Sequence, residues 1–387
     1  MKRARSLTVG LALSLCAAIG ISGTGTPDSP RPRIVLGPSL HAPSPTLVGV
    51  WWHLTEAESM HRIEYGHTPE LGLTATLVDV TRSPRIELTG LAPGSRYWYR
   101  VVSGASKSPI RSFRLPDPDR PFRLVMWADN QGGEDVFAEK TLPEIDRLRP
   151  DLLLAAGDLV DSGECYRDWF FQLYEPAREL LARVPWYPVR GNHDGESALA
   201  REMCPLPGIG GCYAQTYGPL RIVVLDTNKY LTEGSSIEAW LSLELSSPAW
   251  REARFRLVAF HHCPWTNRWD EPGYDGSPDV RELVVPRLER AGTDLMVCGH
   301  THCYQRGARG GLRYLTIGGG GGDLDTVDVA RWDHIERVEV RHHVMVADVT
   351  SDRLDLFAVD TSTGERFDGF DMKPRGAVPV AALEGAR

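Results

Sequence analysis

Five short clusters of acidic, amide and imidazole side chains follow one another along the chain, and their residue types suit metal binding. They are Asp129-Asn130-Gln131, Gly157-Asp158-Leu159-Val160-Asp161, Gly191-Asn192-His193-Asp194, His261-His262 and Gly299-His300-Thr301-His302. Two close divalent cations need several carboxylates or neutral imidazoles, one bridging group and an open position for water and substrate. The clusters meet these needs, so the sequence predicts a site for two metal ions.

Each cluster comes just after an apolar run that we expect to be a β-strand. The runs are Phe122–Trp127, Asp151–Ala156, Trp186–Val189, Phe255–Phe260 and Asp294–Val297. Helix-like stretches separate most of them, and such strand–helix repeats build a mostly parallel sheet. Loops at the carboxyl ends of parallel strands converge on one crevice. We therefore expect the clusters to share one pocket although they lie far apart in the sequence.

The clusters also suggest which residues reach which ion. Asp129 and Asp158 directly follow strands, so their carboxylates should emerge at the sheet edge, and we assign Asp158 as the bridging ligand. His300 and His302 are two positions apart on extended backbone, so they point the same way and can each reach a different ion. Asn192 can supply a neutral carbonyl oxygen, which avoids an excess of negative charge.

The first 25 residues have the features of a secretory signal peptide: a basic start, an apolar core from Leu7 to Ile21 and then a small, polar stretch. That core is too short to span a membrane comfortably, and no later apolar run approaches the roughly 20 residues that spanning needs. We expect a soluble, secreted or periplasmic protein without a transmembrane segment. Leu13-Ser14-Leu15-Cys16 is a poor lipoprotein box, so lipid anchoring is the lesser alternative.

Composition narrows the class of partner. The net charge is −8, the pI is about 5.9 and no Lys/Arg block occurs, which argues against a nucleic-acid polymer as the main partner. After a signal peptide, about 360 residues remain, which favours two domains. We expect the first at 33–117 and the second at 120–375, with a flexible tail at 376–387.

Residues 33–117 have the pattern of an antiparallel β-sandwich, with short alternating strands and frequent turn residues. Residues 91–101 resemble the turn and following strand of a fibronectin type III module, in which a tyrosine closes the corner. Trp51 and Trp52 must face opposite sides of a strand, so we expect one in the sandwich core and the other against the second domain.

Six cysteines remain after the predicted signal peptide, and export would permit disulfides. A bridge between Cys204 and Cys212, from either to Cys165, or between Cys263 and Cys303 is compatible with the sequence, as are unpaired, buried thiols.

The ordered motifs resemble the calcineurin-like metallophosphoesterase superfamily, whose members hydrolyse phosphate esters. The preceding fibronectin-like module and the segments at 262–265, 299–306 and 318–322 are similar to the purple acid phosphatase branch. The resemblance implies an α/β domain of αββα-type sandwich architecture, preceded by an all-β fibronectin type III-like sandwich. It also implies an enzyme, a metal-dependent phosphoric ester hydrolase.

The resemblance further implies a ligand set. One ion would be held by Asp129, Asp158 and His302, and the other by Asp158, Asn192, His262 and His300. We choose His262 over His261 because the family's ligand stands two positions before a proline, here Pro264, which leaves His261 a supporting role.

Two positions depart from the purple enzymes. Asp161 stands where they have the tyrosine that binds Fe(III), so this protein should not be purple. By similarity to calcineurin-type protein phosphatases, Asp161 would orient His193 and favour its protonated form. The next residue is Ser162, however, where those phosphatases have an arginine. Gln131 replaces a common histidine, and its amide oxygen could complete the first ion's shell. Without tyrosinate, we expect two divalent ions such as Mn, Zn or Fe.

The implied function is hydrolysis of small phosphorylated substrates by metal-bound hydroxide, with His193 donating a proton or hydrogen bond to the leaving oxygen. We expect a phosphomonoesterase. The alternatives are a phosphodiesterase or nucleotide pyrophosphatase, and a catalytically inactive exported binding protein. Further candidates for substrate contacts are Asn130, Tyr304 and Arg306, because they adjoin the ligands.

Overall fold

The computed structural model describes residues 32–229, 232 and 234–376. The predicted signal peptide lies outside the described residues, as does the predicted tail except for Gly376. None of the helices in the described part of the chain is long and apolar enough to cross a membrane.

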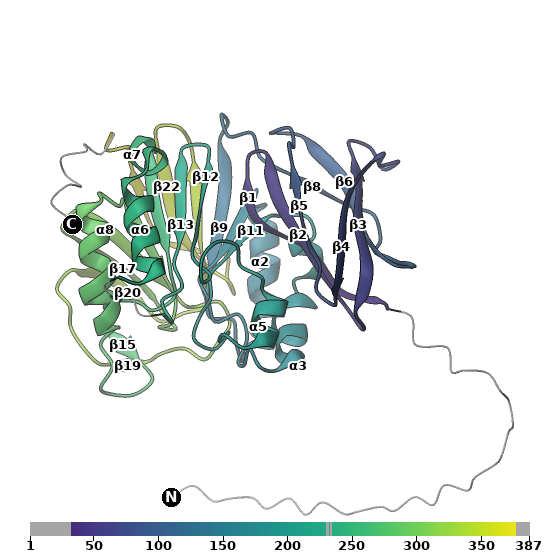
Figure 1. Ribbon diagram of the computed structural model, residues 1–387. Coiled ribbons are helices and arrows are strands. Elements are labelled where there is room, and N and C mark those ends of the chain that lie inside the picture. The colour runs from purple at the N-terminus through teal and green to yellow at the C-terminus, as the bar shows by residue number, and fades with distance from the viewer. Residues whose placement is uncertain (1–31, 230–231, 233, 377–387) are drawn as a thin grey trace, which may run out of the picture. The chain divides into compact units, whose positions relative to one another are not determined.

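The largest sheet has nine strands, among them β22, β9, β11, β1 and β2 (Figure 1). Its order is β23 (Arg366–Met372), β22 (Leu354–Asp360), β21 (His343–Val349), β9 (Phe122–Trp127), β10 (Leu152–Ala155), β11 (Trp186–Pro188), β1 (Ile34–Ser44), β2 (Leu47–Leu54) and β5 (Arg85–Thr89). The strands β9, β10, β11 and β1 run parallel to one another, whereas the outer strands are antiparallel. Three of the strands predicted to precede metal-binding clusters are therefore neighbours in one sheet.

A second sheet of seven strands carries the other two clusters. Its order is β12 (Tyr213–Tyr217), β13 (Leu220–Val224), β14 (Phe255–Ala259), β16 (Leu295–Cys298), β18 (Leu312–Ile317), β17 (Tyr304–Arg309) and β20 (Ile335–Glu339). Its central strands β13, β14, β16 and β18 are parallel. The clusters thus follow strands of two facing sheets rather than of one, which local sequence periodicity does not reveal.

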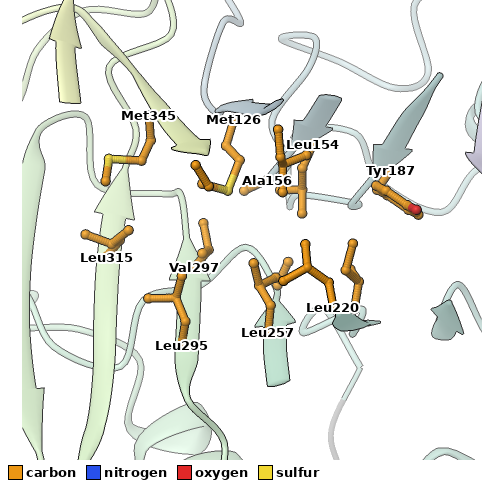
Figure 2. Packing of buried hydrophobic residues seen from close by; sticks show 14 of the residues in the cluster. Met126, Leu154, Ala156, Tyr187, Leu220, Leu257, Leu295, Val297, Leu315 and Met345 are labelled. Carbon is orange, nitrogen blue, oxygen red and sulfur yellow. The ribbon is translucent and has the colours of Figure 1, made fainter. Parts of the chain in front are cut away.

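The two sheets pack face to face through apolar side chains. Met126 and Leu154 of the first sheet face Leu257, Val297 and Leu315 of the second across a common core (Figure 2). The alternate side chains of the same strands point the other way and pack against helices. Burial on both faces explains why these strands are continuous apolar runs rather than alternating ones.

Short helices cover the outer face of each sheet. The first sheet is covered by α1 (Glu134–Val136), η1 (Phe137–Thr141), α2 (Leu142–Arg147), α3 (Tyr166–Asp168), η2 (Trp169–Tyr174), α4 (Arg178–Leu181) and α5 (Ala198–Met203). The second is covered by α6 (Ser236–Ser246), α7 (Pro248–Glu252), η3 (Val280–Val284) and α8 (Val285–Arg290). This helix–sheet–sheet–helix layering confirms the predicted αββα architecture. Two of these helices begin at serine caps, because the Ser235 and Ser247 hydroxyls accept hydrogen bonds from backbone N–H groups of α6 and α7.

The N-terminal part is a β-sandwich, as predicted. Its own sheet contains β4 (Leu73–Thr81), β3 (Glu58–Gly66), β6 (Arg96–Ser103), β7 (Ser106–Lys107) and β8 (Arg111–Arg114). This sheet packs through an apolar core against β1, β2 and β5, which also belong to the nine-stranded sheet. The predicted corner is present, because the Tyr97 hydroxyl accepts a hydrogen bond from the Ala92 N–H at 2.8 Å.

One sheet therefore runs through both parts of the chain. Strand β1 pairs in parallel with β11, with His41 opposite Trp186. Trp52 lies in the sandwich core, whereas Trp51 packs with the helices over the first sheet, as the alternation of strand side chains predicts. Trp51 stacks on Tyr174 with ring centroids 4.5 Å apart.

All six described cysteines are unpaired, so none of the disulfides that the sequence left open is present in this structure.

Candidate metal centre

The loops that follow β9, β10, β14 and β16 are joined by backbone hydrogen bonds at the carboxyl ends of these strands. The Asp129 N–H donates to the Gly157 carbonyl at 3.0 Å, and the Gly299 N–H donates to the His261 carbonyl at 3.0 Å. The His300 N–H donates to the Asp129 carboxylate at 2.9 Å and so links the two sheets. The loops therefore hold their side chains in one fixed arrangement.

Carboxylates and imidazoles converge at this junction. His261 Nε2 lies 3.1 Å from Asp158 Oδ2 and 3.9 Å from Asp129 Oδ1. His300 Nδ1 lies 3.2 Å from His261 Nε2, and His302 Nε2 lies 3.6 Å from Asp129 Oδ1. One ligand atom each from Asp158, His261 and His300 fit within 4.8 Å of one another. This donor set suits a divalent cation.

The backbone is strained at three of the candidate ligands. Asp129, Asp158 and His300 have φ angles of 61°, 50° and 73°, a region that residues other than glycine rarely adopt. Each residue in this conformation destabilises the folded state by on the order of 1–3 kcal/mol, and such strain clusters at functional sites. Half of the non-glycine residues with positive φ in the described chain are thus candidate ligands.

Two glycines of the motifs are needed for this close approach. A Cβ at Gly191 would overlap the carboxylate and backbone nitrogen of Asp158. A Cβ at Gly299 would overlap the Asp129 carboxylate and the Ala128 side chain. The glycines that precede the Asn-His and His-x-His motifs therefore make room for the carboxylates of other loops.

The two adjacent histidines have different surroundings in the structure. We expected His262 to be the ligand, but its Nδ1 lies 2.9 Å from the Thr227 hydroxyl. His261 is fully buried, its Nδ1 donates to the Ala156 carbonyl at 2.9 Å, and its Nε2 faces both aspartates. A spacing to proline cannot show which side chain turns inward, whereas the carbonyl of Ala156 fixes the ring of His261 in this orientation.

The aspartates control the charge of the histidines. Burial alone would lower the pKa of His261, but Asp158 and Asp129 outweigh it and raise the pKa to about 10. Burial opposes protonation of His302 too, but the Asp129 carboxylate raises its pKa to about 9. By contrast, burial and the charge of His261 lower the pKa of His262 to about 3. Ligand imidazoles bind metal in their neutral form, so metal binding here would release protons.

Gln131 supplies an observation that fits a metal ion. Its Nε2 lies 3.2 Å from Asp158 Oδ2 and 3.1 Å from His302 Nε2, while its buried Oε1 has no hydrogen-bond partner. Turning the amide around would direct its oxygen between Asp158 and His302, where a cation would satisfy it.

His193 lies beside these ligands and is exposed. Its backbone N–H donates to Asp158 Oδ1 at 2.9 Å, and its Nδ1 donates to the backbone carbonyl of Asp161 at 2.9 Å. We expected the Asp161 carboxylate to orient His193. Instead that carboxylate accepts a hydrogen bond from Gln172 Nε2 at 3.0 Å, so Asp161 orients the ring through its main chain.

Asn192 is exposed and lines a hollow of about 300 Å³ together with Asp161 and His193. No carboxylate holds its amide in the described structure. Among the residues predicted to hold metal, Asn192 is therefore the one that side-chain contacts restrain least.

The three residues predicted to contact substrate form hydrogen bonds within the fold. The Asn130 amide donates to the carbonyls of Leu159 and Gln172 at 2.8 and 3.0 Å. Tyr304 and Arg306 both donate to Asp368 Oδ2 at 2.7 Å. Tyr304 and Arg306 belong to β17, and their polar ends bind Asp368 of β23.

One supporting residue was given no role by the sequence analysis. The fully buried Asp194 carboxylate accepts hydrogen bonds from the N–H groups of Asp158, Leu159 and Gly191 at 3.0, 2.8 and 2.7 Å. Burial and the charge of Asp158 raise its pKa to about 7. Its place directly after Gly191-Asn192-His193 was the available signal.

Comparisons with known proteins show which proteins this chain is similar to. The family model described as calcineurin-like phosphoesterase matches residues 122–304. Purple acid phosphatase 18 of Arabidopsis thaliana is 26% identical, and the match covers 70% of this chain and 68% of that protein. A cAMP/cGMP dual specificity phosphodiesterase of Mycobacterium tuberculosis is 33% identical, and the match covers 40% of this chain and 49% of that protein.

A solved structure shows the same fold over most of the chain. Purple acid phosphatase PPD1 from yellow lupin (Lupinus luteus) seeds superposes with a TM-score of 0.72 at 17% identity, covering 87% of this chain and 74% of that chain. Residues 122–304 therefore match the calcineurin-like phosphoesterase family, and the chain is similar to purple acid phosphatases in sequence and in fold.

Proposed function

We propose that this protein is a phosphatase that hydrolyses phosphate monoesters with the help of two divalent cations. The observation that carries the proposal is the convergence of Asp129, Asp158, His261, His300 and His302 from four loops onto one junction. Three of these residues adopt strained backbone conformations, which is typical of a functional site.

The donor set divides naturally between two ions. Asp129, Gln131 and His302 lie on one side of Asp158 and would hold one ion with it. His261, His300 and Asn192 would hold the other, with Asp158 shared and His262 supporting the wall of the site. When bound, such ions lower the pKa of water and neutralise charge on phosphoryl oxygens.

His193 is the side chain placed to handle the leaving group. Its Nδ1 donates to the Asp161 carbonyl, so its Nε2 faces away from the loop and is available to substrate. In its protonated form Nε2 would donate a proton to the departing alcohol oxygen, a role worth typically about 10²–10⁴-fold in rate. The hydrogen bond to the Asp161 main chain supports this positioning of the ring.

The test combines elemental analysis with assays of mono-, di- and nucleotide esters on the same preparation. We expect about two divalent ions per chain and a preference for monoesters. His193→Ala should lower turnover by about 10²–10⁴-fold and leave the metal content near that of the wild type. Well-folded protein that binds no metal after supplementation would refute the proposal, and loss of metal from His193→Ala would refute the division of roles.

A phosphodiesterase is the second candidate, because the related M. tuberculosis protein is named as one and is 33% identical. The same ester panel distinguishes the two, since a diesterase would cleave diesters with the higher kcat/KM. Export is also proposed, on the basis of the signal-like sequence of the first 25 residues.

A further inference from the structure

A cavity of about 220 Å³ adjoins the candidate centre on the side of the second sheet. It lies between the loop after β13 and the helix η3. Thr227 and Lys229 line it from the loop, His262 from the end of β14, and Leu283 and Val284 from the helix. None of these residues except His262 was assigned a role by the sequence.

His262 forms the wall between this cavity and the centre. Its ring centroid lies 4.6 Å from that of His300, while its Nδ1 is held by the Thr227 hydroxyl at 2.9 Å. A substrate whose phosphate sits at the metal ions could therefore place its organic part beside His262 and extend into the cavity.

The cavity lining has two chemically different sides. Leu283 and Val284 give it an apolar floor, whereas Thr227, Lys229 and the exposed Asp279 give it a polar side. The Lys229 ammonium lies 3.3 Å from Glu196 Oε1, and since an ammonium has three donors, two remain for a ligand. A ring with an apolar C–H face and a hydroxyl edge matches these two sides.

The volume of the cavity limits the size of the ligand that it can hold. The cavity is smaller than the roughly 300–1,000 Å³ of typical pockets for drug-sized ligands. A single sugar ring or a comparable cyclic polyol matches this volume, whereas a nucleoside adds one or two further rings to its sugar. The presence of both an acid and a base in the lining also favours a neutral, hydroxylated group over an anionic one.

We propose that this cavity binds the alcohol part of the substrate and that the substrate is the phosphate monoester of a single sugar ring or cyclic polyol. The inference rests on the proposed phosphatase function and adds the class of substrate to it. Lys229 and Asp279 hydrogen-bond the hydroxyls, and Leu283 and Val284 pack against the C–H face.

The first test fills the cavity. Leu283 lines it without being fully buried, so Leu283→Trp should occupy its space with little disturbance of the core. We expect kcat/KM for a hexose monophosphate to fall by about tenfold or more, while the inhibition constant of inorganic phosphate stays unchanged. The matched control is Leu243→Trp, which adds the same side chain at a position that is 71% exposed on α6. It should leave both constants unchanged.

The second test removes the charge of Lys229. Lys229→Met should raise KM for the hexose monophosphate by about tenfold, the size expected for a lost charge-assisted hydrogen bond, without changing kcat or inhibition by phosphate. An equal loss of phosphate inhibition would place Lys229 on the phosphate and overturn the assignment. A wild-type preference for adenosine monophosphate over the hexose monophosphate would overturn it as well.

Direct binding separates this inference from the proposed function. Calorimetry with the metal-loaded protein compares hexose monophosphate with inorganic phosphate. Tighter binding of the sugar ester, lost in Leu283→Trp but kept in Leu243→Trp, supports the cavity assignment even if no ester is cleaved. Equal affinities of the wild type for the two ligands, or an unaffected Leu283→Trp variant that retains its fold, would refute it.

Discussion

Two sets of histidines are buried in this protein, one where the N-terminal sandwich meets the phosphoesterase domain and one in the loops of the candidate centre. His41 and His53 belong to the first set, and their ring nitrogens contact the hydroxyls of Ser39 and Ser83 at 3.0 and 2.6 Å. In the second set, His261 and His302 face aspartates. His41, His53 and His261 are fully buried and the side chain of His302 is 18% exposed, but only the second set is surrounded by negative charge.

The difference in neighbours decides the charge state. Burial lowers the pKa of His41 to about 3 and that of His53 to about 4, so both are neutral. Glu202, whose side chain is 33% exposed and lies 3.6 Å from His53, does not reverse this. In the centre, the aspartates overcome burial and raise the pKa values of His261 and His302. A buried histidine is therefore weak support for a metal site unless carboxylates face it.

The largest expected effect comes from removing the shared carboxylate of the centre. Asp158→Asn keeps the shape of the side chain but removes its charge, so metal affinity and kcat/KM should fall by more than the roughly 10–100-fold typical of residues that only support ligands. Equilibrium dialysis with elemental analysis measures the affinity. Asp348→Asn is the matched control, because Asp348 pairs with Arg123 on the opposite end of the first sheet. Unchanged metal binding in Asp158→Asn would show that the carboxylates of the centre do not bind metal, and the contrast between the two sets of histidines would then have no basis.

The adjacent residues His261 and His262 allow the same comparison within the centre, because only one of them faces carboxylates. His261→Gln should weaken metal binding more than His262→Gln, because only His261 directs a ring nitrogen at both aspartates. For His262→Gln we expect about a tenfold to hundredfold loss, the range of a supporting residue. Equilibrium dialysis of both variants at one pH gives the ranking. The reverse order would restore His262 as the ligand.

Neutral His41 should make the stability of the protein depend on pH. Its folded pKa of about 3 lies below its unfolded value, so the unfolded state binds more protons between about pH 6.5 and 3. The contribution of neutral His41 to the free energy of unfolding is fully present above pH 6.5 and is lost as the pH falls toward 3. The total loss is about 3–5 kcal/mol. Urea unfolding of the wild type and of His41→Gln at several pH values measures this slope. The slope should be shallower in His41→Gln.

His67 is the matched control for that experiment, because it is an exposed histidine of the same sandwich. His67→Gln should keep the slope of the wild type. Equal slopes in the wild type and in His41→Gln would show that His41 is not held neutral by burial, and the contrast with the centre would then be lost.

The smallest effect is expected from a hydroxyl of the first set. Ser39 accepts a hydrogen bond from Trp186 Nε1 at 3.0 Å and contacts His41 at the same distance. Ser39→Ala leaves these buried groups unpaired and should lower the free energy of unfolding by about 1–3 kcal/mol. Metal content and kcat/KM should be unchanged. A loss of metal from Ser39→Ala would mean that the two regions are coupled.

The sequence by itself determined much of this protein. The five ordered clusters predicted which loops meet, since strand–turn chemistry is local and the carboxyl ends of parallel strands share an edge. The bounds of β9 were predicted at Phe122–Trp127 because an apolar run flanked by polar residues has clear ends. The alternation of strand side chains also placed Trp51 and Trp52 on opposite faces.

Tertiary structure alone decided the orientation of individual side chains. His261 rather than His262 turns inward because the Ala156 carbonyl, 105 positions away in the chain, receives its ring nitrogen. Asp161 reaches His193 through its main chain, and Tyr304 and Arg306 are bound to Asp368. The pairing of β1 with β11, which joins the sandwich to the strands that carry the first three clusters, was likewise absent from local patterns. Contacts between distant segments depend on packing geometry, and residue spacing carries no record of it.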